Sequence, residues 1–333
     1  MIGNSYIAQT WSQLNGFFGA DAEHSISITR VTPGGTQLAT HAETASTQNL
    51  ISTGGPWDVV VLQDQSQTPA YAALSQGWWD TFYTVGALPL SNLATAAGAK
   101  VLFFQTWARA AGDTATLQYF NNDPLVMQNA LTSSYGEAAE LLNAAVAPVG
   151  EAWRDALIAN PSLALHSSDR SHPNANGAFL TGAVLYEAIT GKDARDLSYT
   201  GSLSAANATF LKSIAHYVNF KDWIAGFSGL SSTDPAADGD GDGLSNEREW
   251  LADTDPSDDA IHFELGVDQS ASGVRLVFPA ASSRLFLLES RASADAEWEV
   301  MEQMLGNGTM YEMLLPSGGA TAWYRVGARR PGL

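Results

Sequence analysis

Short β-branched apolar runs alternate with longer helix-forming segments over the first 190 residues, and this alternation constrains the fold most. Residues 57–62 (Trp-Asp-Val-Val-Val-Leu) and 100–105 (Lys-Val-Leu-Phe-Phe-Gln) are typical of strands buried on both faces. We expect further strands at 25–31 and 163–165, and helices at 77–99 with a break at Pro89, 126–146, 150–159 and 175–190. This order predicts an α/β fold in which helices cover both faces of a parallel sheet. Functional groups then belong beyond the carboxyl ends of the strands.

The composition changes twice beyond this α/β segment, and 333 residues exceed one average domain. Glycine and serine gather at 226–233, an acidic run follows, and short alternating stretches separated by turn residues fill 261–324. Such stretches predict a small antiparallel β domain. We therefore expect a large α/β domain at 1–226, an acidic linker at 227–260 and a small β-sandwich-like domain at 261–333.

The net charge of −19, from 35 acidic and 16 basic residues, excludes the partners that need a basic surface. Nucleic acids and anionic membranes are therefore not expected as partners. The chain has no cysteine, which excludes disulfides, thiolate metal sites and a cysteine nucleophile. No apolar run approaches the ~18 residues that a membrane span requires.

The first candidate for chemistry is a serine at the expected junction between a strand and a helix. Ile2 leads into Gly3-Asn4-Ser5, and a helix-like stretch follows. A serine at such a turn has its hydroxyl at the sheet edge and its N–H at a helix N-terminus, where an anion is stabilised. Taken alone, the serine could equally be a helix cap.

Three other segments at expected strand ends carry suitable groups. Asp169 precedes His172 by three residues, so its carboxylate can hydrogen-bond the imidazole Nδ1 and leave Nε2 to take a proton. Gly35, in Pro33-Gly-Gly-Thr36, lets a backbone N–H approach a ligand. Residues 62–67 place glutamine amides after a buried strand, where they can donate to an oxyanion. Each segment alone could be a turn or a cap.

In this order the four segments resemble the conserved blocks of the SGNH (GDSL-like) hydrolase superfamily, across about residues 1–195. Gly3-Asn4-Ser5 matches the Gly-x-Ser block, Gly35 the glycine block, and Asp169 with His172 the Asp-x-x-His block. The resemblance implies a three-layer α/β/α fold and hydrolysis of acyl esters. Ser5 would attack the acyl carbon, His172 would carry the proton and Asp169 would orient the imidazole.

The resemblance also implies an oxyanion hole, and here the sequence departs from the family. The N–H groups of Ser5 and Gly35 would form part of the hole. The family's Gly-x-Asn-Asp block has no asparagine here; Gln63-Asp64-Gln65 stands in its place, and we place Gln65 in the asparagine position. We expect Trp107 and Gln63 to line the substrate pocket, although a core position for Trp107 fits equally well.

Two other residues near these blocks carry weaker expectations. His41 follows Gly35 by six residues and could lie near the site. Trp78 and Trp79 are adjacent, so on a helix they cannot share one narrow face, and we expect one of them to be exposed or at a pocket rim.

The acidic run contains a calcium-loop pattern. Residues 238–249 match the twelve-residue EF-hand loop, with candidate ligands at Asp238, Asp240, Asp242, Leu244 (by its carbonyl), Asn246 and Glu249. The following segment resembles thrombospondin type 3-like repeats of secreted proteins, which would make Asp253 or Asp255 a further ligand. The alternative is a disordered acidic linker. We expect a structural Ca²⁺, no cofactor for catalysis, and a secreted or cell-surface protein.

Three functions fit these features. The first is a carboxylesterase acting on short-chain acyl or aryl esters. The second is a carbohydrate esterase that removes acetyl groups from polysaccharide, with the terminal domain as a targeting module. The third is a calcium-dependent surface binding protein with an inactive hydrolase fold, which the missing asparagine motivates and the intact Ser5, Asp169 and His172 oppose.

Overall fold

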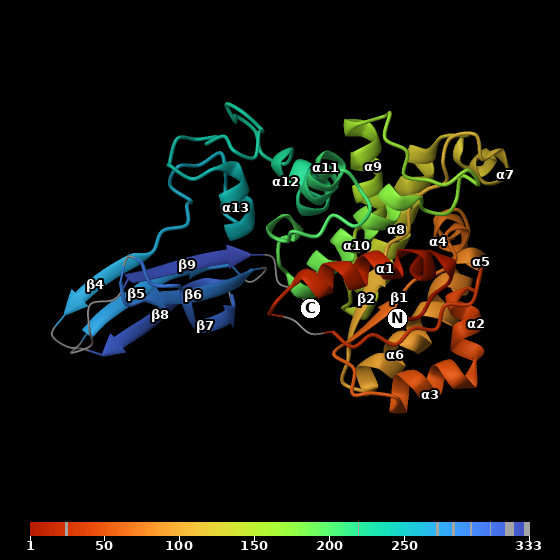
Figure 1. Cartoon of the computed structure of the whole chain (residues 1–333), viewed down its shortest axis with the longest axis horizontal. Coiled ribbons are helices and arrows are strands. Elements are labelled where there is room, and N and C mark those ends of the chain that lie inside the picture. Colours follow the sequence, from red (N-terminus) through yellow and green to blue (C-terminus); the bar gives the residue numbers. More distant parts are fainter. Residues whose placement is uncertain are drawn as a thin grey trace. The chain divides into compact units, whose positions relative to one another are not determined.

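The structure, a computed structural model, describes residues 1–23, 26–218, 220–270, 273–281, 284–293, 295–306, 308–316 and 323–329. Contacts divide the chain into two units, Met1–Val218 and Asn219–Gly332. The first unit carries the parallel sheet and most of the helices, and the second carries the antiparallel strands (Figure 1). Each unit is described by itself.

A parallel sheet lies at the centre of the first unit. Strand β1 (Val59–Leu62) pairs with β2 (Lys100–Phe104), and β2 pairs with β3 (Ala145–Ala147), both in parallel. The extended backbone at Ile2 continues the sheet, because Ile2 forms parallel bridges with Leu62 on one side and Val31 on the other. The segment that leads to Ser5 therefore lies between its two neighbours, at the point where the chain order reverses, which is where ligands bind in open α/β sheets.

Helices cover both faces of this sheet. They are α1 (Ser5–Ala20), α2 (Leu38–Glu43), α3 (Ala45–Thr53), α4 (Gln67–Ala72), α5 (Gln76–Trp79), the π-helix η1 (Asp80–Ala87), α6 (Leu88–Ala96), α7 (Thr114–Leu117), the 3₁₀ turn η2 (Gln118–Phe120), α8 (Pro124–Leu142), α9 (Val149–Ala159), α10 (Ala175–Thr190), the 3₁₀ turn η3 (Ala194–Asp196) and α11 (Ala205–His216).

Two apolar cores separate the helices from the sheet. Alternate strand residues face opposite cores, as the two-residue period of a strand requires: Val61 packs with α1, α9, α10 and α11, whereas Val60 and Leu62 pack with α2, α3, α6 and α8. Strand β2 divides in the same way, with Phe104 in the first core and Phe103 in the second. The expected three-layer α/β/α fold is confirmed.

Several expected elements are confirmed and others are wrong. Strands 57–62 and 100–105 and the helix at 175–190 are present. The helical run at 77–99 is not broken at Pro89: the π-helix η1 continues directly into α6, and Pro89 lies in the first turn of α6, where proline is tolerated. The expected strand at 25–31 is reduced to one bridge at Val31, and its residue Ser25 lies outside the described residues.

The last strand of the sheet lies where a helix was expected. Helix α8 ends at Leu142, and Asn143 follows in the left-handed conformation with φ 48°. Residues Ala145–Ala147 then pair with β2 as β3, whereas 163–165 form no strand. Alanine favours a helix by intrinsic propensity, and pairing with β2 overrides that preference here.

The second unit contains α12 (Phe220–Ile224), α13 (Asn246–Ala252) and the strands β4 (Gly266–Ser270), β5 (Gly273–Ala280), β6 (Leu285–Arg291), β7 (Glu299–Leu305), β8 (Thr309–Pro316) and β9 (Trp323–Arg329). The strands form two antiparallel sheets, β4-β5-β8 and β7-β6-β9. A small core of Phe278, Ala280 and Phe286 lies among them. The expectation of a small antiparallel β domain is confirmed.

Candidate active site

Ser5 is held at the end of the central sheet segment by its preceding residues. Asn4 caps α1 with its side chain, whose Oδ1 accepts from the Tyr6 N–H at 3.1 Å, and the Asn4 N–H donates to Gln63 Oε1 at 3.0 Å. A Cβ on Gly3 would lie 2.5 Å from Gln63 Oε1, so only glycine fits beside this contact. The Gly-Asn-Ser order is thus required by the local packing.

Ser5, His172 and Asp169 form a continuous hydrogen-bonded chain. The Ser5 Oγ lies 2.9 Å from His172 Nε2, and His172 Nδ1 lies 2.5 Å from Asp169 Oδ2. Ser5 and His172 are 167 residues apart in the sequence, and the loop before α10 brings them together. A carboxylate acceptor makes Nδ1 the protonated nitrogen, so Nε2 is free to accept the proton of the Ser5 hydroxyl.

The Asp169 carboxylate is itself held by its own loop. Its Oδ1 accepts from the Ser171 N–H at 3.0 Å, the His172 N–H at 2.9 Å and the Ser167 hydroxyl at 2.8 Å. Desolvation acts to raise the pKa of Asp169, but these donors and His172 outweigh it and hold the pKa well below the usual range. Asp169 is therefore ionised throughout the neutral pH range.

Three groups are the candidate oxyanion donors: the Ser5 N–H, the Gly35 N–H and the Gln65 side chain. The Ser5 N–H lies in the first turn of α1, where helix amides have no intrahelical acceptor, and none of the described hydrogen bonds uses it. Gly35 adopts φ 69°, the left-handed region that favours glycine. Gly35 and Gln65 both line one cavity of about 330 Å³. The Gln65 side chain pairs with Gln67 there, with Nε2 donating to Gln67 Oε1 at 3.0 Å.

The expectation that Gln63 lines the substrate pocket is wrong. Its side chain is fully buried, Oε1 accepts from the Asn4 N–H, and Nε2 donates to the Asp64 carbonyl. Both ends of the amide are therefore engaged by backbone, and Gln63 braces the turn that carries Ser5. Its position directly after β1 points it back under the sheet edge.

Trp107 is a core residue, as one of the two expectations had it, and it also borders a cavity. It is 1% exposed and stacks between Tyr6 and Trp153, with ring centroids 4.3 and 4.0 Å away. Its indole N–H donates to the Ser171 carbonyl at 2.9 Å, next to His172. Trp107 also borders a second cavity of about 510 Å³, whose walls include Leu157. It is thus a core residue that also forms part of a cavity wall.

His41 lies beneath the serine turn. Its Nε2 donates to the Gly3 carbonyl at 2.8 Å, and burial lowers its pKa despite this bond. His41 is a buried neutral imidazole that fixes the backbone before Ser5. The expectation that one tryptophan of the pair at 78–79 is exposed at a pocket rim is confirmed, since Trp78 is 40% exposed and lines the 330 Å³ cavity.

Two groups near the site were not singled out from the sequence. The Tyr6 hydroxyl lies 2.8 Å from Ser171 Oγ, and its ring meets the His172 ring edge-on at 5.5 Å. Asp64 accepts from the N–H groups of Leu38 and Gln65 and ties together the two loops that flank Ser5. Burial raises the pKa of Asp64 to about 7. Only its place next to the glutamines could have identified Asp64.

The acidic loop of the second unit brings its candidate ligands together. Carboxylate oxygens of Asp238, Asp240 and Asp242 lie within 4.8 Å of one another. Among the described residues, four buried oxygens of this loop have no hydrogen-bond partner: Asp240 Oδ2, Asp242 Oδ2, Asn246 Oδ1 and Glu249 Oε2. Burial and then the charges of Asp240 and Asp242 raise the pKa of Glu249 to about 7.

The remaining candidate ligands of this loop have other contacts. The Leu244 N–H donates to Asp242 Oδ1 at 2.6 Å, which shapes the loop in the way a calcium loop requires. Asp253 Oδ1 lies 3.2 Å from the Arg284 guanidinium, and Asp255 Oδ1 accepts from Ser257. Asp253 and Asp255 thus have protein partners, whereas Asp240 Oδ2, Asp242 Oδ2, Asn246 Oδ1 and Glu249 Oε2 have no hydrogen bond in the described structure. The donor set of this loop fits a hard cation such as Ca²⁺.

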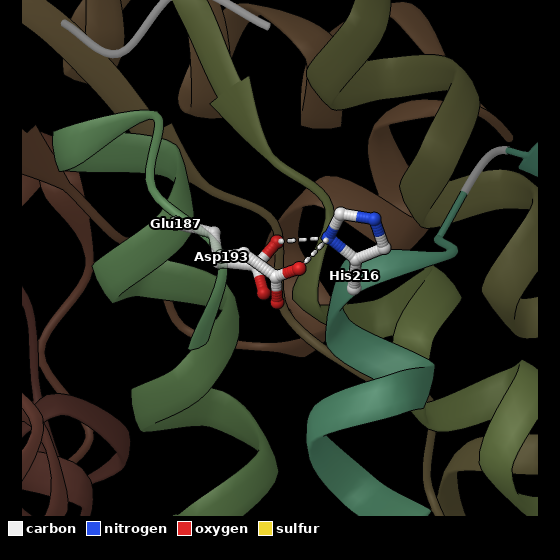
Figure 2. Close-up of side chains that lie close together, drawn as sticks. All are labelled: Glu187, Asp193 and His216. Carbon is white, nitrogen blue, oxygen red and sulfur yellow. Dashed lines mark ion pairs between the residues drawn. The ribbon is translucent and has the colours of Figure 1, made fainter. Parts of the chain in front are cut away.

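A second polar cluster in the first unit joins α10 to α11. His216 Nδ1 lies 3.4 Å from Asp193 Oδ2 and 3.7 Å from Glu187 Oε2, and Figure 2 shows both carboxylates turned toward this nitrogen. The Arg195 guanidinium binds Asp193 Oδ2 at 2.6 Å. A cation at this position would be repelled by Arg195, so we assign the cluster to ion pairing that fastens the two helices.

Comparison with known proteins identifies shared structure. No family model matches the sequence, and no curated protein matches it. A DUF4886 family protein from Bacteroides uniformis matches with a TM-score of 0.54 at 17% identity, over 66% of this chain and 94% of its own. A candidate SGNH hydrolase from Slackia heliotrinireducens matches with a TM-score of 0.46 at 26% identity, over 56% and 95%. The first likeness shows a shared fold. Within the described residues, no helix is long and apolar enough to span a membrane.

Proposed function

We propose that the first unit is a serine ester hydrolase of the SGNH type. The observation that carries the proposal is the chain from Ser5 Oγ through His172 to Asp169, with distances of 2.9 and 2.5 Å. A nucleophile, a base and a group that orients the base, aligned in this way, are the arrangement that activates a serine. The fold places them at the chain reversal of the sheet, where a substrate has access.

Catalysis follows from this geometry. His172 Nε2 removes the proton of the Ser5 hydroxyl as Oγ attacks the acyl carbon, and the carbonyl oxygen becomes an oxyanion. As the tetrahedral intermediate collapses, the bond to the alcohol breaks and His172 returns the proton to the leaving oxygen. Water then gives a proton to His172 as it attacks the acyl-enzyme, and His172 returns this proton to Ser5 Oγ as the bond to the acyl group breaks and the acid leaves. Asp169 stabilises the imidazolium through Nδ1–H during both steps.

The oxyanion would be bound by the N–H groups of Ser5 and Gly35 and by the side chain of Gln65. The Ser5 amide is oriented by α1, whose N-terminal dipole favours negative charge. Gln65 Nε2 carries two hydrogens, one of which is used by Gln67, so the second is available. Glutamine would thus replace the asparagine of related enzymes from a longer side chain.

The test is hydrolysis of p-nitrophenyl acetate, butyrate and octanoate by the wild type and Ser5→Ala. Activity in the wild type that is lost in the variant establishes the serine esterase, and the chain-length profile gives the size of the acyl site. Retained circular dichroism of the variant excludes unfolding as the cause. Equal activity in both proteins, or none on any ester, would favour a binding protein with an inactive hydrolase fold.

We further propose that residues 238–249 bind one structural Ca²⁺. The observation that favours it is the set of four buried oxygens without hydrogen bonds, one each from Asp240, Asp242, Asn246 and Glu249. Buried polar groups normally have partners, and clustered carboxylates repel each other unless a cation neutralises them. Weak oxygen sites of this kind fill at extracellular calcium levels, which supports a secreted or cell-surface location.

Calcium titration by calorimetry on the full chain tests this second proposal. Stoichiometric binding that is lost in Glu249→Gln supports it, because the twelfth loop position supplies the bidentate ligand of this motif. Binding by the wild type that survives unchanged in Glu249→Gln would place the ion elsewhere. Hydrolysis of p-nitrophenyl acetate in chelator separates a structural ion from one that takes part in the reaction.

A further inference from the structure

The 330 Å³ cavity beside the candidate oxyanion donors has an unusual lining for an ester hydrolase site. Its walls carry glutamine amides, threonine hydroxyls and two aromatic rings, and none of the described residues that line it is charged. The lining side chains relevant here are Thr36, Thr40, Gln65, Gln67, Tyr71 and Trp78. A cavity of this volume lies at the lower end of the range for small-molecule sites.

This cavity spans the two loops that flank Ser5. Thr36 follows Val31, and Gln65 follows β1, so the two residues continue the segments on either side of Ile2 in the sheet. The Asn4 side chain donates to the Thr36 carbonyl at 3.1 Å, which fixes one wall to the residue before Ser5. Gly35 and Gln65, the two candidate oxyanion donors besides the Ser5 N–H, also line the cavity, and this connects it to the proposed reaction site.

Hydrogen bonds fix the glutamine amides on the cavity wall, and some of their donor and acceptor positions remain available to a ligand. Gln65 and Gln67 brace each other, and Gln67 Nε2 also donates to Thr116 at 2.8 Å. In the described hydrogen bonds Gln65 uses one of its two amide hydrogens and one of its acceptor positions. Preoriented neutral donors and acceptors suit a ligand that carries several hydroxyl groups.

The aromatic side of the cavity offers a stacking surface. Trp78 is 40% exposed although it is a large apolar side chain, and its ring lies 5.2 Å from that of Tyr71. The Tyr71 ring is held in place by stacking on Phe120, with the two ring centroids 5.8 Å apart. Burial raises the pKa of Tyr71, so this wall stays neutral. An exposed indole beside fixed amides matches the apolar C–H face and polar rim of a sugar ring.

We propose that this cavity binds a neutral sugar ring, so that the substrate is an acylated saccharide. The inference rests on the serine hydrolase proposed above and names its substrate class. A long acyl chain would leave the amides and hydroxyls of the lining without partners, which costs binding energy. An anionic substrate would need a basic residue among the lining groups, and the described lining has none.

The experiment compares two acetate esters that differ in the alcohol, 6-O-acetylglucose and ethyl acetate, whose alcohol has no ring that could stack on Trp78. We expect Trp78→Ala to lower kcat/KM on the sugar ester about threefold to tenfold, mainly through KM, since ring stacking contributes about 0.5–1.5 kcal/mol. The rate on ethyl acetate, which does not reach the stacking surface, should stay within about twofold. Thr40→Val, which keeps the shape and removes a hydroxyl, should change the two rates in the same selective way.

The matched control is Trp323→Ala, which removes an exposed tryptophan of the second unit. It should leave both rates unchanged on these small substrates. Equal losses on both esters in Trp78→Ala, or no loss on the sugar ester, would overturn the sugar site. Wild-type hydrolysis of p-nitrophenyl esters with none of 6-O-acetylglucose or acetylated xylo-oligosaccharides would overturn it while the esterase stands. No Ser5-dependent hydrolysis of any ester would overturn the esterase itself.

Discussion

The site around Ser5 and the acidic loop at 238–249 are both built from polar groups, but they differ in how those groups are satisfied. Asp169 has a donor at both carboxylate oxygens, and His172 is bonded at both ring nitrogens. In the loop, four buried oxygens have no hydrogen bond. A network that is complete within the chain keeps its geometry without a ligand, whereas the loop is where we propose that a cation supplies the missing partners.

Apart from loss of the nucleophile, the comparison predicts the largest effect for the carboxylate that orients His172. Asp169→Asn should lower kcat by about 10³- to 10⁴-fold, because an amide favours the wrong imidazole tautomer. Stopped assays with p-nitrophenyl acetate measure the loss, and the exposed Asp196→Asn is the control that should keep full activity. An Asp169→Asn protein as active as the wild type would remove Asp169 from the triad.

Removing Ca²⁺ with a chelator should lower the thermal stability of the second unit and leave ester hydrolysis unchanged. Adding Ca²⁺ at about 100 times its Kd should stabilise the second unit by about 2.7 kcal/mol, because only the folded loop binds the ion. Thermal unfolding monitored by tryptophan fluorescence, with EDTA and then Ca²⁺, measures the shift. The Ser5-dependent rate should change by less than about twofold. A calcium-independent Tm would mean that the loop balances its carboxylates by protonation alone.

Asp64 differs from the other polar groups discussed near Ser5, because its buried Oδ2 has no hydrogen bond in the described structure. Its folded pKa of about 7 exceeds the ordinary 3.8. The stability that neutral Asp64 contributes is therefore full below the unfolded pKa and is lost as pH rises through the folded pKa.

Asp64→Asn keeps the side chain neutral at every pH. Its stability relative to the wild type should grow by about 1.4 kcal/mol for each pH unit between the two pKa values of Asp64. Urea unfolding at several pH values measures this difference. The exposed Asp58→Asn should show no such trend, and a flat difference for Asp64→Asn would mean that Asp64 is ionised when buried.

The smallest loss of kcat should come from removing the single hydrogen bond that the Ser167 hydroxyl donates to Asp169. Ser167→Ala removes one of the donors to Asp169 Oδ1 and leaves the backbone donors in place. Loss of one such bond costs about 1 kcal/mol, so kcat should fall about fivefold with KM unchanged. A loss as large as that of Asp169→Asn would show that Ser167 determines the orientation of the carboxylate.

Much of the fold and part of the site could be predicted from local patterns. The strand runs at 57–62 and 100–105 and the helix at 175–190 were correct, because buried β-branched runs and capped helices are determined by nearby residues. The expected strand at 25–31 was wrong, and so was the end of the helix expected at 126–146, whose last two residues belong to β3. Both depend on which neighbour the backbone pairs with, and that neighbour is far along the chain.

By itself the sequence determined the groups whose partners are close in the chain. Asp169 and His172 are three residues apart, and Gly3, Asn4 and Ser5 follow one another, so their geometry is set by one turn. Only the tertiary structure decided that Ser5 Oγ meets His172 across 167 residues, that Gln63 turns inward, and that Trp78 lines the cavity beside Gln65. Side-chain direction at a sheet edge depends on packing between distant segments, and no local pattern specifies it.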